Sequence, residues 1–151
     1  MALVHRDVVV TAVIGHTAYQ ISVLDDKVRS TMNAPDLNAW IDDVKAQPDA
    51  DGIGMMLMHR GVVRGTARSG EPVSVMHLTY DHERLAQVIQ DARTWTGILA
   101  VRAWVNEGTL KVGDDIMSVL VAGDIRPNVF SALERLVGLI KSEVVSETEE
   151  R

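Results

Sequence analysis

Three arginines, Arg60, Arg64 and Arg68, are spaced four residues apart in a segment with three glycines between residues 60 and 70. Guanidinium groups bind phosphate and carboxylate groups through paired hydrogen bonds, and glycines let backbone N–H groups approach an anion closely. These residue types are typical of an anion-binding loop. The alternative interpretation is an ordinary solvated hairpin loop, which needs no ligand.

A second candidate is Arg126, which precedes Pro127 at the expected start of the last helix. The free N–H groups and the dipole of a helix N-terminus favour an anion, and Arg126 would reinforce such a site. The alternative is that Arg126 is simply an exposed surface residue. Lys141 lies on the same expected helix, off its apolar stripe, and taken alone is typical of a solvated lysine.

The sequence contains no motif for nucleophilic catalysis, nucleotide binding or metal binding. There is no informative Ser–His–Asp spacing, no P-loop and no dinucleotide-binding fingerprint. His77 and His82 are five residues apart, which matches no familiar ligand spacing, so we predict no metal site and no cofactor. The absence of cysteine excludes disulfides, thiolate metal sites and a cysteine nucleophile belonging to the chain itself.

The 151 residues carry 15 Lys and Arg against 21 Asp and Glu, a formal net charge of −6. This acidic balance argues against nucleic acid or an anionic membrane as a general partner, since both attract clustered Lys and Arg. No apolar stretch is long enough to span a bilayer. We therefore expect a soluble, cytoplasmic protein with one domain over residues 1–145, of which residues 1–35 form a hairpin extension, and an acidic tail over residues 146–151.

Residue patterning predicts the elements that position these side chains. β-branched and apolar runs predict strands over residues 8–14, 19–24, 53–63, 73–80, 98–105 and 115–122. Apolar residues at helical spacing predict three helices, which begin near Asp36, Asp81 and Pro127, and a loop is expected over residues 64–72. Short connections between successive strands predict an α+β fold, a mainly antiparallel sheet with the three helices packed against one face.

Several short pieces occur in an order and at spacings that are distinctive together: 51–54 (DGIG), 61–64 (GVVR), 90–95 (QDARTW), 101–105 (VRAWV), 107–115 (EGTLKVGDD), 130–133 (FSAL) and 139–141 (LIK). In these pieces the chain, from about residue 36 to residue 144, resembles the catalytic (large) subunit of molybdopterin synthase, the MoaE family. The resemblance implies an α/β-hammerhead-like fold and a homodimer. It also implies a partner, a small ubiquitin-like sulfur-carrier subunit whose C-terminal Gly-Gly thiocarboxylate enters a pocket of the large subunit.

The implied reaction transfers sulfur to cyclic pyranopterin monophosphate, a phosphorylated pterin, and forms the dithiolene of molybdopterin. Because this chain has no cysteine, the sulfur must arrive on the partner. The family's G-x-x-R arginine falls on Arg64, the arginine of its His-Arg pair on Arg126, and its catalytic lysine on Lys141. Arg64, Arg126 and Arg68 would hold the anionic substrate and the carrier tail, and Lys141 would attack the thioacyl carbon or assist proton transfer.

The chain departs from the family pattern at four of the implied site positions, Val105, Asn106, Ile125 and Thr148, where the family has cationic or titratable residues. The leading hypothesis is a molybdopterin synthase type of sulfurtransferase. The nearest alternative is a diverged, catalytically weak relative that only docks the carrier. A third alternative is an unrelated α+β interaction domain that binds no phosphate.

Overall fold

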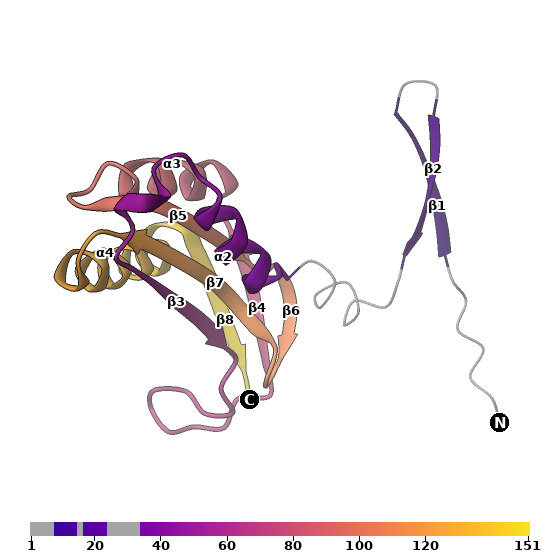
Figure 1. Cartoon of the computed structure of the whole chain (residues 1–151). Helices are drawn as coiled ribbons and strands as arrows, with labels where there is room; N and C mark the ends of the chain where they lie inside the picture. Colours follow the sequence, from indigo (N-terminus) through magenta and orange to yellow (C-terminus); the bar gives the residue numbers. More distant parts are fainter. Residues whose placement is uncertain (1–7, 15–16, 24–33) are drawn as a thin grey trace. The chain divides into compact units, whose positions relative to one another are not determined.

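The computed structural model describes residues 8–14, 17–23 and 34–151 of the chain (Figure 1). The chain forms two compact units, Met1–Ala34 and Pro35–Arg151. In the first unit, β1 (Val8–Ile14) pairs antiparallel with β2 (Thr17–Val23). Both strands lie where the β-branched runs predict them, although residue 24 of the second prediction lies outside the described residues.

The second unit contains two three-stranded antiparallel sheets. The strand order of one sheet is β3-β7-β5, with β3 (Met55–Val62), β7 (Asp115–Gly123) and β5 (Ile98–Val105). The strand order of the other is β6-β4-β8, with β6 (Gly108–Lys111), β4 (Val75–Tyr80) and β8 (Val145–Glu150). The predicted α+β class with mainly antiparallel strands is confirmed.

The main core lies between the sheets and two helices, α3 (His82–Ala92) and α4 (Arg126–Leu139). Alternate residues of β7, namely Met117, Val119 and Val121, point into this core because successive strand residues face opposite sides of a sheet. A π-helical turn, η2 (Ile140–Val144), continues α4 and leads directly into β8. None of the described helices is long and apolar enough to cross a membrane.

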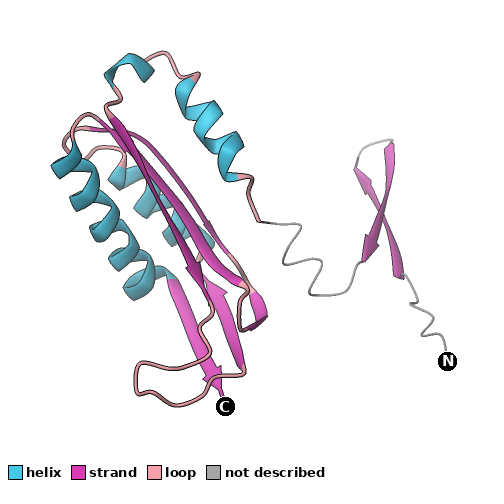
Figure 2. Ribbon diagram, turned by 60° about the horizontal axis from the view of Figure 1, so that its bottom comes forward, coloured by secondary structure: helices cyan, strands magenta, loops and turns pink. Residues whose placement is uncertain are grey.

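The helix α2 (Leu37–Lys45) packs against the β3-β7-β5 sheet, on the face that points away from the main core (Figure 2). Its Val44 lies with Ala100, Leu120 and Ala122, which are the residues of β5 and β7 that point away from the main core. The prediction that all helices share one face is therefore wrong. β7 is apolar on both faces, as a strand covered on both sides must be.

Two polar segments form strands that composition does not indicate. Residues 146–151, predicted as an acidic tail, instead provide most of β8, which pairs with β4 from Tyr80 opposite Val145 to Val75 opposite Glu150. The turn-rich stretch before Asp115 similarly provides β6. In both cases the backbone hydrogen bonds to β4 determine the conformation, and tertiary pairing overrides local propensity.

Candidate functional site

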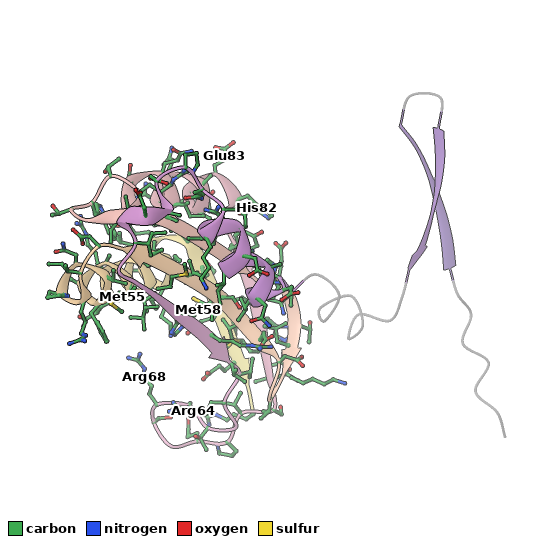
Figure 3. All side chains as sticks on the ribbon, in the orientation of Figure 1. Met55, Met58, Arg64, Arg68, His82 and Glu83 are labelled. Atoms are coloured by element: carbon green, nitrogen blue, oxygen red, sulfur yellow. The ribbon has the colours of Figure 1, made fainter. Side chains whose placement is uncertain are left out.

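The loop that carries two of the candidate arginines is anchored at its base. The pairing of β3 with β7 shifts register between Gly61 and Val62, and the next residue, Val63, is buried and donates its N–H to the carbonyl of Asp114. The Val73 N–H donates to the Gly65 carbonyl at 3.0 Å, which closes the loop. Arg64 and Arg68 lie on this closed loop, beyond the end of β3 (Figure 3).

Lys141 is positioned by the π-helical turn η2. The residues on either side of it in the turn, Ile140 and Val144, are buried in the main core, while Lys141 itself is exposed. Ser142 Oγ donates to the carbonyl of Gly138 at 2.9 Å, which ties the turn back to α4. Single π-helical turns inside or after α-helices are frequent at functional sites, because they change the direction of the side chains that they carry.

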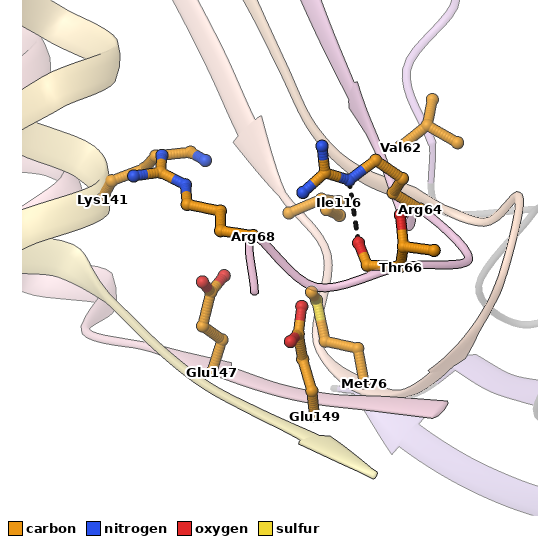
Figure 4. Close-up of a pocket in the computed structure, with 9 residues that line it drawn as sticks. All are labelled: Val62, Arg64, Thr66, Arg68, Met76, Ile116, Lys141, Glu147 and Glu149. Carbon is orange, nitrogen blue, oxygen red and sulfur yellow. Dashed lines mark hydrogen bonds between the residues drawn. The ribbon is translucent and has the colours of Figure 1, made fainter. Parts of the chain in front are cut away.

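The loop, the π-helical turn and the last strand surround a cavity of about 710 Å³ (Figure 4). Three of the predicted site residues, Arg64, Arg68 and Lys141, line it together although they are up to 77 positions apart in the sequence. The complete lining is Val62, Arg64, Thr66, Arg68, Met76, Ile116, Lys141, Glu147 and Glu149. The Nε of Arg64 donates to the Thr66 carbonyl at 2.9 Å, and this bond fixes the guanidinium at the mouth of the loop.

The other two candidate arginines lie elsewhere. Arg60 forms two hydrogen bonds to the carboxylate of Asp115, at 2.8 and 2.6 Å, and is not part of the cavity. Arg126 begins α4, whereas Lys141 follows its end. At 1.5 Å per residue the helix separates them by about 20 Å, so one copy of the chain does not bring Arg126 to the cavity.

The N-terminus of α4 already has an anion of its own. Asp124 Oδ1 accepts the Ile125 N–H at 2.6 Å and the Asn128 side-chain amide at 3.0 Å. The Asn128 hydrogen bond, and after it the Ile125 N–H, lower the pKa of Asp124. An external anion would compete with this carboxylate, which weakens the case for an anion site at Arg126.

His59 is a titratable residue close to Lys141 that no sequence motif indicates. Its Nε2 is buried and has no hydrogen-bond partner within the described part of the chain. Burial, and after it the positive charge of Lys141, lower the pKa of His59. Both effects favour the neutral form of this imidazole.

The four departures from the family pattern occupy ordinary structural positions. Val105 is buried in the main core, and Thr148 is a residue of β8 opposite His77. Asn106 is also buried: its Nδ2 donates to the Asp115 carbonyl at 2.8 Å and its Oδ1 accepts the Glu107 N–H at 2.8 Å. Ile125 is 56% exposed.

The described residues contain no group of three or more His, Asp or Glu side chains placed to hold a metal ion. His77 contacts Thr109 and Glu150, at 3.1 and 2.7 Å, while His82 stacks on the ring of Tyr80. The cavity instead presents three cationic side chains and two carboxylates. Such a lining can hold anionic groups and can place an amine beside them.

The sequence interpretation missed the two carboxylates of this cavity. Glu147 and Glu149 were expected in a tail, and only the pairing of β8 with β4 brings them opposite the arginine loop. The alternation of uncharged and charged residues over 146–149 (SETE) was the one available signal, since a period of two is typical of a strand.

Comparisons with known proteins agree with this fold. The family model named MoaE protein matches residues 31–143 of the chain. No curated protein sequence gives a match.

Among solved structures, the chain is similar to the molybdopterin biosynthesis MoaE protein of Burkholderia ambifaria MC40-6, at 25% identity and a TM-score of 0.62, over 76% of each chain. It is similar to molybdopterin cofactor biosynthesis protein E of Burkholderia multivorans ATCC 17616, at 25% identity and a TM-score of 0.61, over 79% of this chain and 84% of that one. A third similarity is to a chain in the complex of subunits 1 and 2 of molybdopterin-converting factor from Helicobacter pylori 26695, at 14% identity and a TM-score of 0.57, over 77% and 79% of the chains. At that lower identity the likeness concerns the fold alone.

Proposed function

The chain belongs to the MoaE protein family, and from this premise we propose that it is the large subunit of a molybdopterin synthase, a cytoplasmic sulfurtransferase. Family membership supports a role in molybdenum cofactor biosynthesis. The proposed reaction transfers sulfur from a thiocarboxylated ubiquitin-like carrier to cyclic pyranopterin monophosphate. The observation that carries the proposal is the convergence of Arg64, Arg68 and Lys141 on one cavity.

The cavity's cationic groups suit the two anions of this reaction. The pterin carries a phosphate, and the carrier ends in a thiocarboxylate that becomes a carboxylate once the sulfur has left. Guanidinium groups bind both through paired hydrogen bonds. We assign Arg64 and Arg68 to holding the phosphate and the carrier tail.

Lys141 is the proposed catalytic residue. Its amine either attacks the thioacyl carbon of the carrier or moves a proton during sulfur transfer. In the first case the C–S bond breaks, the sulfur leaves as hydrosulfide for the pterin, and water then hydrolyses the amide formed with Lys141 to give the carrier carboxylate. The π-helical turn presents this amine at the cavity, and no ion pair to Lys141 occurs within the described residues. A lysine that is not engaged by a carboxylate is available to react with a ligand.

The proposed partners are the carrier subunit and a second copy of the chain. The Helicobacter pylori structure holds two subunits of molybdopterin-converting factor together, which supports a partner for this fold. A homodimer would also offer Arg126 a role, since within one copy α4 keeps Arg126 away from Lys141. Arg126 would then act on the cavity of the other copy.

The alternative function is a docking module that binds the carrier without conversion. It is favoured by Asn106, which stands at a position where the family has a cationic or titratable residue. The Asn106 side chain is buried, and its amide forms hydrogen bonds to the backbone at the ends of β5 and β7 instead of facing a ligand. The two carboxylates in the cavity also reduce its positive charge.

The test is conversion of cyclic pyranopterin monophosphate by the purified chain with a thiocarboxylated carrier. Formation of molybdopterin, lost in Lys141→Ala, is the expected result. Carrier binding without conversion would favour the docking module, and neither binding nor conversion would overturn both functions. Lys45→Ala, on α2, is the matched control and should convert the pterin normally.

A further inference from the structure

The two carboxylates of the cavity stand on the core-facing side of an edge strand. β8 lies at the edge of its sheet, and its Glu149 and Glu147 are opposite Met76 and Leu78 of β4. Directly opposed residues share a face of the sheet, and both Met76 and Leu78 are buried in the main core. Apolar residues would therefore be expected at positions 147 and 149, but both carry charges that line the cavity.

These two carboxylates have no polar partner among the described residues. Within the described residues no hydrogen bond or ion pair involves the side chain of Glu147 or Glu149. Their neighbours are engaged: Glu150 pairs with His77 at 2.7 Å, and Glu143 pairs with Arg84. Figure 4 shows both carboxylates pointing into the cavity from the strand, with Arg68 and Lys141 above Glu147.

A cavity with separated cations and carboxylates is complementary to a ligand that has both an anionic group and a hydrogen-bond donor edge. A carboxylate accepts two parallel N–H bonds from a planar edge, as it does from a guanidinium group. The pterin ring has such an edge, formed by its N3–H and its 2-amino group. Its phosphate is the complementary anion for the arginines.

We propose that Glu147 and Glu149 determine specificity for the pterin, by accepting the N3–H and 2-amino donors while Arg64 and Arg68 hold the phosphate. This inference rests on the proposed function, because it takes its substrate class from it. It adds a recognition role for two residues of β8, and it explains why carboxylates occur in a cavity that binds an anion.

Two simpler explanations predict different outcomes. Inward-pointing charges on an edge strand discourage pairing with other chains, and they need no ligand for that purpose. The carboxylates could otherwise only repel anions, which would tune the affinity of the cavity for every phosphate in the same direction.

The experiment compares two ligands by isothermal titration calorimetry: cyclic pyranopterin monophosphate, and inorganic phosphate, which has no donor edge. The variants are Glu147→Gln and Glu149→Gln, with Glu150→Gln as the control on the same strand but the opposite face. Thermal unfolding of each variant verifies that it is folded.

We expect at least one of the Glu147→Gln and Glu149→Gln variants to bind the pterin about tenfold more weakly, the usual effect of losing a hydrogen bond to a charged group. The same variant should bind inorganic phosphate as tightly as the wild type or more tightly, and Glu150→Gln should change neither. Unchanged or tighter pterin binding in both variants would overturn the inference and leave the proposed function standing. A wild-type protein that does not bind the pterin would overturn the proposed function, and the inference with it.

Discussion

The two ends of α4 carry charged residues in opposite situations. At the N-terminal end, the carboxylate of Asp124 is already engaged, because it accepts hydrogen bonds from the Ile125 N–H and the Asn128 side-chain amide. At the C-terminal end, Lys141 faces a cavity with Arg68 and forms no ion pair among the described residues. Satisfied charges stabilise a fold, whereas charges that remain available at a cavity can bind a ligand. Variants at the C-terminal end should therefore change activity, and variants at the N-terminal end should change stability.

The largest expected effect is on turnover at the C-terminal end. Lys141→Ala should lower kcat by about 1,000-fold, since it removes the proposed nucleophile or proton carrier. Because Lys141 is exposed, the midpoint of thermal unfolding should change by no more than about 2 °C. Turnover assays and thermal unfolding measure the two effects. Normal turnover in Lys141→Ala would contradict the assignment.

The second effect is on stability at the N-terminal end. Gly97 has φ +75°, and a Cβ there would lie 2.3 Å from Asp124 Oδ1 and 2.4 Å from Asn128 Nδ2. Gly97→Ala should lower the free energy of unfolding by about 2–4 kcal/mol, from backbone strain together with this overlap.

The matched control for Gly97 is Gly70, which has φ +89° and no atom within 4 Å of the added Cβ. Gly70→Ala should cost about 1–2 kcal/mol, the backbone contribution alone. Urea denaturation measures both variants. Equal losses would show that the packing around Asp124 contributes nothing.

A smaller effect is expected at Arg64. Arg64→Ala should raise KM for the pterin about tenfold and change kcat less, because the arginine binds the phosphate in the ground state and the transition state alike. Arg60→Ala is the control, since Arg60 is already paired with Asp115 outside the cavity. If both variants raise KM equally, the net charge of the loop and not the cavity would be responsible.

The smallest effect concerns pH. The pKa of His59 is lowered from its ordinary value of 6.5, so the folded state favours the neutral imidazole. The contribution of His59 to stability is then complete above pH 6.5 and is lost as the pH falls from 6.5 toward the lower pKa of the folded state. Between pH 7.5 and pH 5 the wild-type midpoint should fall about 1–3 °C more than that of His59→Phe, measured by thermal unfolding. Equal falls in the two proteins would contradict the lowered pKa.

Most of the local structure could be predicted from the residues. Asp36 accepts the N–H groups of Asn38 and Ala39, and Asp81 accepts that of Arg84, so both predicted helix starts are confirmed. The predicted strand over 98–105 matches β5. These features depend on neighbours in the sequence, which composition and spacing report well.

The features that depend on distant segments could not be predicted in the same way. The polar residues after Val145 form β8 only because β4 offers them a free edge. The position of α2 depends on the second apolar face of β7. For the same reason the cavity contains Glu147 and Glu149, which no motif indicated, while Arg126, which a motif did indicate, lies at the far end of α4.

The most direct test of where the ligand binds is a crystal structure of the protein with cyclic pyranopterin monophosphate. The expected result places the phosphate within hydrogen-bond distance of Arg64 or Arg68, in the cavity between the loop and η2. A phosphate bound instead beside Asp124 at the N-terminus of the same copy's α4, with the cavity empty, would contradict the assignment of function to the C-terminal end.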